Sequence, residues 1–217
     1  MNLEVLAQGL SGYLCVVLII TVHEFGHAWM ASRCGDDTAR LLGRVTLNPA
    51  AHIDPLGTVL LPLLAVFLSA SGNAGVAGFI IGWGKPVPVN IGNLRHRVRD
   101  DILVSMAGPA MNIVIALAAM LLGRIALAAE MTLIVEATMM MTIISMFLFF
   151  FNLIPIPPLD GSRVMRHVVG MGEEAYANLT RYGFFILIIA IQIPAVQKGL
   201  GLATRLSVAF LRWMFLY

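Results

Sequence analysis

The chain has 217 residues, of which 59% are hydrophobic and 12% charged, and its mean hydropathy is +0.88. A soluble domain carries about a quarter charged residues, so this composition excludes an ordinary soluble protein. The net charge of +2 is too small to indicate nucleic acid binding. We therefore expect an all-α polytopic membrane protein, folded as a single domain over residues 1–217. Residues 1–8 contain Glu4 and no Lys or Arg, which is not typical of a cleaved signal peptide.

The first predicted span, residues 5 to about 33, contains the pattern His23-Glu24-Phe25-Gly26-His27. Residues four apart on a helix lie on one face, so both imidazoles can reach one zinc ion. The glutamate between them is rotated off that face, near the metal but free to handle protons. Soluble zinc peptidases carry this pattern in a water-exposed cleft. Here the preceding residues are apolar, which predicts a site inside the bilayer.

Less regular segments follow the first span. Residues 40–47 could form a short strand, and residues 55–70 make a second span that is barely long enough to cross. Residues 76–83 are apolar but too short to cross alone, which indicates a re-entrant segment. Residues 85–90 should be extended, because each proline pushes the preceding residue out of the helical region. We therefore expect short membrane-associated β or re-entrant segments here.

Three more spans are predicted in the second half, at residues 101–122, 131–154 and 182–196. The last segment, 198–217, suits a helix lying in the membrane interface at least as well as a span. Its cations recur every seven residues and so share one helix face: Lys198, Arg205 and Arg212. The total is five or six transmembrane helices.

The cations predict the orientation of the chain. Arg124 lies alone between the third and fourth spans, whereas most other cations fall in connections that could share one side. Cytoplasmic loops carry an excess of Lys and Arg, so the cation-rich side should be cytoplasmic. His27 precedes Arg33 by six residues, which places it about 9 Å deeper along a helix. The metal site should therefore lie below the cytoplasmic surface.

A third zinc ligand is needed, because catalytic zinc takes three protein ligands and keeps a fourth position for water. The fourth predicted span ends in a proline-rich stretch that is followed by Asp160 and Gly161. A carboxylate beside so many apolar residues is costly unless it is paired or bound to metal. The alternative for Asp160 is an Asp-Gly turn at the surface that merely ends the helix.

At this point the sequence resembles the site-2 proteases, which are intramembrane zinc metalloproteases. The resemblance runs from the first span to about Arg163. The chain looks like a minimal form, without the peptide-binding or nucleotide-sensing domains of some members. It is carried by three motifs: His23-Glu24-x-x-His27, Ala107-Gly108-Pro109-Ala110-Met111-Asn112 and Asn152-x-x-Pro155-x-Pro157-x-x-Asp160-Gly161.

The resemblance implies one zinc ion held by His23, His27 and Asp160, with Glu24 as the general base. It also implies a catalytic core at about residues 5–165, followed by C-terminal helices at about 174–217. The location it implies is a prokaryotic cell membrane, with the active site toward the cytoplasm.

Three further polar residues have two readings each, and two more histidines have one. Asn152 is implied to contact substrate near the metal, but it could hydrogen-bond between helices. Asn112 could also bind substrate, or could belong to a close-packing helix face. His52 could approach the zinc site or be a loop histidine near the lipid headgroups. His96 and His167 lie beside arginines and are expected to be solvated near anionic lipid.

The expected activity is hydrolysis of peptide bonds in or near transmembrane segments of other proteins, as in regulated intramembrane proteolysis. The partners are then a transmembrane protein substrate and membrane lipid, with no nucleic acid, and the sequence does not indicate an oligomeric state. A helical substrate must unwind before zinc can reach a carbonyl, so residues 40–47 and 83–90 are candidates to pair with it by strand addition.

Other functions are also compatible with the pattern. A non-catalytic zinc-binding chaperone or scaffold would not need Glu24. A membrane zinc protease of another type would take a glutamate as third ligand, and Glu173-Glu174 is the only late glutamate pair. A metal transporter would space its polar ligands through the membrane, whereas here they cluster at one depth.

Overall fold

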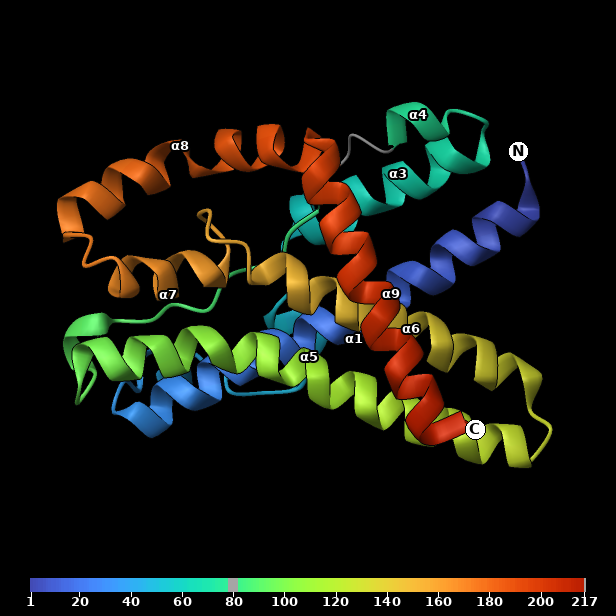
Figure 1. The fold of residues 1–217 in the computed structure, drawn as a ribbon, viewed down its shortest axis with the longest axis horizontal. Helices are drawn as coiled ribbons and strands as arrows, with labels where there is room; N and C mark the ends of the chain where they lie inside the picture. Colours follow the sequence, from blue (N-terminus) through green and yellow to red (C-terminus); the bar gives the residue numbers. More distant parts are fainter. Residues whose placement is uncertain (78–81, 217) are drawn as a thin grey trace.

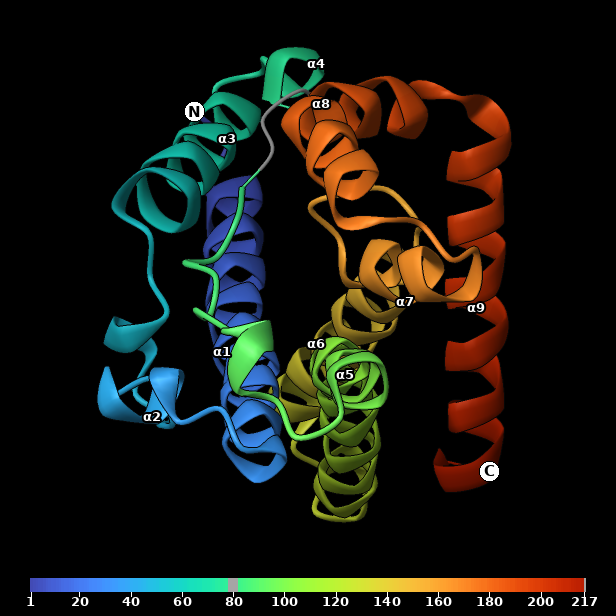
Figure 2. The same cartoon turned by 90° about the vertical axis from the view of Figure 1, so that its left-hand side faces the viewer.

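Three long apolar helices form the body of the protein, α1 (Leu3–Cys34), α5 (Arg97–Ala128) and α6 (Thr132–Asn152). The structure is a computed structural model that describes residues 1–77 and 82–216. At 1.5 Å per residue, each of the three helices is long enough to cross a bilayer. α5 packs against both α1 and α6, and the three run along the long axis of the molecule (Figures 1 and 2).

The ends of α1 explain why it runs unbroken through the histidine motif. The side chain of Asn2 accepts hydrogen bonds from the backbone N–H groups of Glu4 and Val5, at 3.0 and 3.3 Å. At the other end Gly35 adopts φ +107°, a left-handed conformation that favours glycine. Both capped ends of the helix thus lie well away from the histidine motif.

The remaining apolar segments do not form separate full spans. Residues 55–70 fold as a six-residue π-helical stretch, η2 (Pro55–Leu60), followed by the ten-residue α3 (Leu61–Ala70), which together are short of the roughly 20 residues needed to cross. The two C-terminal helices, α8 (Glu173–Gln192) and α9 (Pro194–Leu216), are bent by 78° at their junction.

Three helices, or four if the bent pair counts as one broken span, can therefore cross the membrane in the part of the chain described here. The all-helical class is confirmed, but the expectation of five or six spans is not. One predicted span is too short, and residues 182–196 and 198–217 are parts of one bent pair.

Short helical elements occupy the connections, and there is no strand within residues 1–77 and 82–216. The predicted strand at 40–47 is wrong, because residues 38–41 form a helical turn and residues 42–47 continue in turns and bends. Residues 78–81, part of the predicted re-entrant segment, lie outside the described residues. The short elements are α2 (Thr38–Leu41), η1 (Pro49–Ala51), α4 (Ala74–Ala77), η3 (Ile91–Asn93) and α7 (Asp160–Val168).

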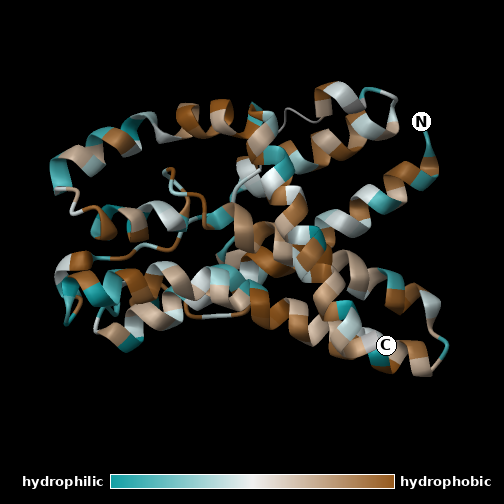
Figure 3. Ribbon diagram, in the orientation of Figure 1, coloured by the Kyte–Doolittle hydropathy of each residue, from teal (hydrophilic) through white to brown (hydrophobic). Residues whose placement is uncertain are grey.

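Polarity is distributed as expected for a membrane protein. Figure 3 shows hydrophobic residues along the middle of the helices, whereas hydrophilic ones gather near the end of the bundle where α5 begins. Many large apolar side chains are exposed and can face lipid, whereas several polar ones are fully buried between helices. These buried polar residues include Ser105 and Asn112 on α5, and Thr142 and Ser145 on α6.

Candidate metal centre

The two histidines of α1 and the aspartate that begins α7 meet at one point. The Nε2 atoms of His23 and His27 are 3.1 Å apart. One Asp160 oxygen lies 3.2 Å from Nε2 of His23, and the other lies 3.3 Å from Nε2 of His27. Both histidines are 8% exposed. Residues more than 130 positions apart in sequence therefore form one group, with both histidines buried and Asp160 partly buried.

These residues fit a zinc ion. Tetrahedral zinc with ligand bonds of about 2.0–2.1 Å holds its ligand atoms about 3.3 Å from each other, close to the observed spacings. The donor set of two imidazole nitrogens and one carboxylate is that of a catalytic site with an open fourth position. In the described residues, this is the one group of three His, Cys, Asp or Glu side chains arranged to hold a metal.

The backbone of α5 orients one of the ligands. Nδ1 of His27 lies 2.7 Å from the carbonyl oxygen of Val104, and a carbonyl only accepts. Nδ1 therefore carries the proton and donates, which leaves the Nε2 lone pair directed at the metal position.

A glycine on α5 makes room for the metal centre. A Cβ atom built on Gly108 would lie 2.6 Å from Nε2 of His23, and still closer to Nε2 of His27. A Cβ on Gly26 would lie 2.9 Å from the carbonyl oxygen of Ala107. The two helices therefore approach most closely beside the ligands. The sequence indicated a close-packing face at Ala107-Gly108, but not that Gly108 faces the two imidazoles.

The expected base, Glu24, is hydrogen-bonded to an extended segment. Its Oε2 accepts the N–H of Val87 at 3.0 Å. The same segment donates the N–H groups of Trp83 and Lys85 to the carbonyls of Gly57 and His52, at 3.1 and 2.9 Å. Alternate residues therefore bond to the protein on one side, which agrees with the predicted extended conformation of residues 85–90, although no strand forms there.

Asp160 is brought to the histidines by the turn after α6. α6 ends at Asn152, and α7 begins at Asp160. A Cβ on Gly161 would lie 2.5 Å from the carbonyl carbon of Leu153, so glycine permits the chain to fold back closely. Each oxygen of the Asp160 carboxylate faces one imidazole nitrogen. The ordinary pKa of an aspartate is about 4, so the carboxylate is ionised at neutral pH and suited to bind a cation.

A profile of peptidase family M50 matches residues 11–129 and 123–190. The chain belongs to this family. M50 peptidases are the site-2 proteases, so the resemblance read from the three motifs is confirmed.

Relatives of this M50 peptidase are bacterial. It is 36% identical over 195 residues to "Putative zinc metalloprotease YwhC" of Bacillus subtilis, covering 85% of this chain and 82% of that protein. It is 28% identical over 191 residues to "Putative zinc metalloprotease Rip2" of Mycolicibacterium smegmatis, covering 87% and 68%. Rip2 of Mycobacterium tuberculosis H37Rv is 25% identical over 179 residues, covering 82% and 65%. No solved structure gives a significant match. The chain is thus a membrane metalloprotease whose cofactor is zinc.

Other predicted residues of this M50 peptidase lie around the centre rather than in it. The side-chain amide of Asn152 donates to Leu148 within its own helix, at 2.9 Å. Asn112 lies one turn beyond Gly108 on α5 and is fully buried, and among the described residues neither polar atom of its amide has a hydrogen-bond partner. An unpartnered buried amide costs free energy, and a bound substrate could supply the missing hydrogen bond. The substrate contact of Asn112 therefore stays a prediction.

Two histidines differ from expectation. His52 is buried instead of lying near headgroups, with Nε2 2.9 Å from the carbonyl of Thr46, and it is not part of the metal group. It holds the loop beside Glu24 together. His167 is not solvated, because Nε2 lies 2.7 Å from a carboxylate oxygen of Asp101.

The alternative ligand Glu173 is also outside the centre, since it pairs with Arg166 at 3.5 Å and is exposed.

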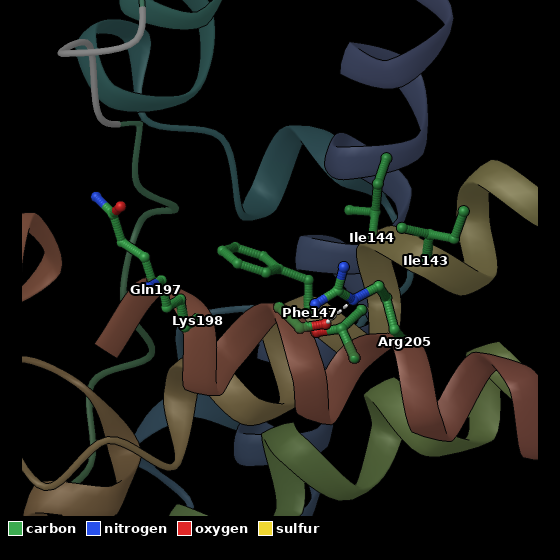
Figure 4. A pocket seen from close by; sticks show the side chains of 8 residues that line it. Ile143, Ile144, Phe147, Gln197, Lys198 and Arg205 are labelled. Carbon is green, nitrogen blue, oxygen red and sulfur yellow. Dashed lines mark hydrogen bonds between the residues drawn. The ribbon is translucent and has the colours of Figure 1, made fainter. Parts of the chain in front are cut away.

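A cavity of about 530 Å³ lies apart from the metal centre, between α6 and α9. Figure 4 shows the side chain of Arg205 beside Phe147 there, and Nε of this arginine donates to the carbonyl of Gly201 at 3.2 Å. None of the residues that line this cavity belongs to the metal group. They are Ile143, Ile144, Phe147, Gln197, Lys198, Gly201, Thr204 and Arg205.

Proposed function

We propose that this M50 peptidase hydrolyses peptide bonds in or near the transmembrane segments of membrane proteins, as in regulated intramembrane proteolysis. The observation that carries the proposal is the meeting of His23, His27 and Asp160 between apolar helices, with Glu24 beside them. A water-requiring site among helices that face lipid is suited to substrates that already lie in the membrane. Its partners are thus a transmembrane protein and the surrounding lipid.

Glu24 is proposed as the general base. Bound zinc supplies Lewis-acid chemistry, polarising a carbonyl oxygen and lowering the pKa of water. Because Oε2 of Glu24 is held by the N–H of Val87, Oε1 is left to take the proton of the attacking water and return it to the leaving amine. This hydrogen bond also fixes the carboxylate in place before the substrate arrives.

The extended segment 83–90 is proposed to hold the unwound substrate. Trp83, Lys85 and Val87 turn their N–H groups toward the protein, so the residues between them turn their backbone groups to the opposite edge. Pro86 and Pro88 have no N–H, and the carbonyl of Pro86 accepts from Arg44 at 3.4 Å, so the carbonyls of Gly84 and Pro88 are the acceptors proposed for the substrate. A substrate strand whose own helical hydrogen bonds are broken could donate to them. Residues 40–47 form a helical turn followed by turns and bends, so they have no strand edge with which a substrate could pair.

The metal centre is proposed to face the cytoplasm. The end of α1 near the centre carries Arg33, stacked over Trp29 at 5.3 Å. α5 begins at the same end of the molecule (Figure 1), next to a group of arginines. The cation-rich side of a membrane protein is usually cytoplasmic. Cleavage there would release a cytoplasmic fragment.

The test is cleavage of a single-span substrate by purified protein in lipid vesicles, with zinc content measured on the same samples. We expect about one zinc per chain, and we expect Glu24→Gln to keep zinc but lose cleavage by at least about 100-fold. Glu4→Gln, an exposed position on the same helix, is the matched control and should cleave normally. Full cleavage by Glu24→Gln would refute the base role. Zinc binding without cleavage by the wild type would favour the chaperone or scaffold alternative.

A further inference from the structure

α5 supplies no zinc ligand, yet one of its faces supports the whole centre. Asp101, Val104 and Gly108 lie at positions i, i+3 and i+7, which share a helix face. Val104 orients His27 through its carbonyl, and Gly108 makes room for both imidazoles. The role of the third member of this face, Asp101, is not accounted for by the proposed mechanism.

The carboxylate of Asp101 is 1% exposed and binds only side chains of α7 among the described residues. Oδ2 lies 2.7 Å from Nε2 of His167, which must donate because the carboxylate only accepts. Oδ1 lies 3.6 Å from the guanidinium of Arg163. A buried carboxylate without partners is strongly unfavourable, so this cluster holds α7 firmly against α5.

α7 is the helix that begins with the zinc ligand. It has nine residues, too few for a helix to be stable without tertiary contacts. Asp160, Arg163 and His167 lie at i, i+3 and i+7 and so share the face turned toward α1 and α5. Fixing the far end of this face fixes the direction in which its first residue points.

The opposite side of α7 is attached to α8 instead. The hydroxyl of Ser162 is 2.9 Å from that of Tyr176, and Arg166 stacks over the Tyr176 ring at 5.1 Å. α8 contributes no residue to the metal group. The contact through Asp101 thus relates Asp160 to the helix that also orients His27.

We propose that Asp101 is a positioning residue of the metal centre. Through His167 and Arg163 it holds α7 so that the Asp160 carboxylate reaches the two imidazoles. The inference rests on the zinc site of the proposed function and assigns a role to a carboxylate that touches neither metal nor substrate. Residues that orient ligands in this way typically change metal affinity by about 10–100-fold when mutated.

The experiment measures the zinc dissociation constant of the full chain in detergent by competition with a chromophoric chelator. We expect Asp101→Ala to weaken zinc binding by about 10–100-fold. Asp101→Asn should lose less, because its amide oxygen can still accept from His167. His167→Ala should weaken binding similarly, and the double variant Asp101→Ala/His167→Ala should be no worse than the more severe single variant, because both break one contact.

Ser105→Ala is the matched control. This serine is as deeply buried on α5 as Asp101. Within the described part of the chain its hydroxyl bonds only to the carbonyl of Asp101 in the same helix, at 2.7 Å. Its zinc affinity should equal that of the wild type. Melting temperatures of the zinc-free proteins separate a loss of folding from a loss of positioning, and Asp101→Asn and His167→Ala allow a decision where Asp101→Ala does not fold.

Outcomes are distinguishable. A wild-type protein that binds no zinc would refute the proposed function, and this inference with it. A wild type that binds zinc, with Asp101→Asn and His167→Ala both within about twofold of it, would refute the positioning role alone. A graded loss from Asp101→Asn to Asp101→Ala, with unchanged KM of the zinc-saturated enzymes and an unaffected Ser105→Ala, would support it.

Discussion

Gly108→Ala offers a sharp test of the metal centre, because it should separate stability from zinc binding. The added Cβ would lie 2.6 Å from Nε2 of His23 and closer still to Nε2 of His27, where ordinary carbon contacts need about 3.5 Å. The imidazoles or α5 must therefore move by on the order of 1 Å. A misplacement of this size at an active site can cost about 100-fold in activity, and we expect at least this loss in cleavage together with weaker zinc binding.

The zinc-free protein should respond in the opposite direction. Without zinc the two imidazoles can turn away from the new Cβ, and alanine is favoured over glycine inside a helix by about 1 kcal/mol. The substitution should therefore leave the melting temperature of the zinc-free protein equal or higher. The assay is a pair of thermal melts, with and without zinc, alongside cleavage. The control is Gly12→Ala on α1, where the new Cβ meets only the sulfur of Met140 at 3.8 Å. Wild-type zinc affinity and cleavage in Gly108→Ala would refute the geometry described for the centre.

Three further outcomes are expected. Val87→Pro removes the N–H that holds Glu24, so it should lower kcat by about 10-fold or more while zinc content stays the same. Chelation should abolish cleavage, and added zinc should restore it, as read from the cleaved fragment on a gel. Burial alone raises the pKa of the Asp36 carboxyl, but the hydrogen bonds that it accepts outweigh burial and lower this pKa. The ionised carboxylate therefore stabilises the fold above the unfolded-state pKa of about 4. This stabilisation is lost as the pH falls through the folded-state pKa. Acid melts between about pH 6 and pH 3 should thus show a smaller loss of stability for Asp36→Asn than for the wild type. The donors to Asp36 are Thr38, Asn90 and Asn93.

The number of spans could not be predicted from the sequence. Residues 55–70 are apolar enough to suggest a span, but the length of the helix that they form depends on where the chain turns. Asp54 caps a π-helical stretch there, which shortens the helix. The 78° bend between α8 and α9 is equally hidden, because a proline limits helix geometry locally without giving the angle between its two sides. Hydropathy measures composition, whereas a span also needs a straight and sufficiently long helix.

The sequence by itself determined the helical character of the chain, the family and the residues that meet at the metal centre. The spacing of His23 and His27 was enough for the first two ligands, because helix periodicity relates residues four apart without reference to the rest of the fold.

Only the tertiary structure decided which buried groups support the centre. Gly108 faces the imidazoles because α1 and α5 pack closely there, and His167 meets Asp101 across 66 positions of sequence. No local period relates such residues. Whether a histidine is solvated or paired depends on which helix packs against it, and that is determined by the burial and fit of many side chains at once.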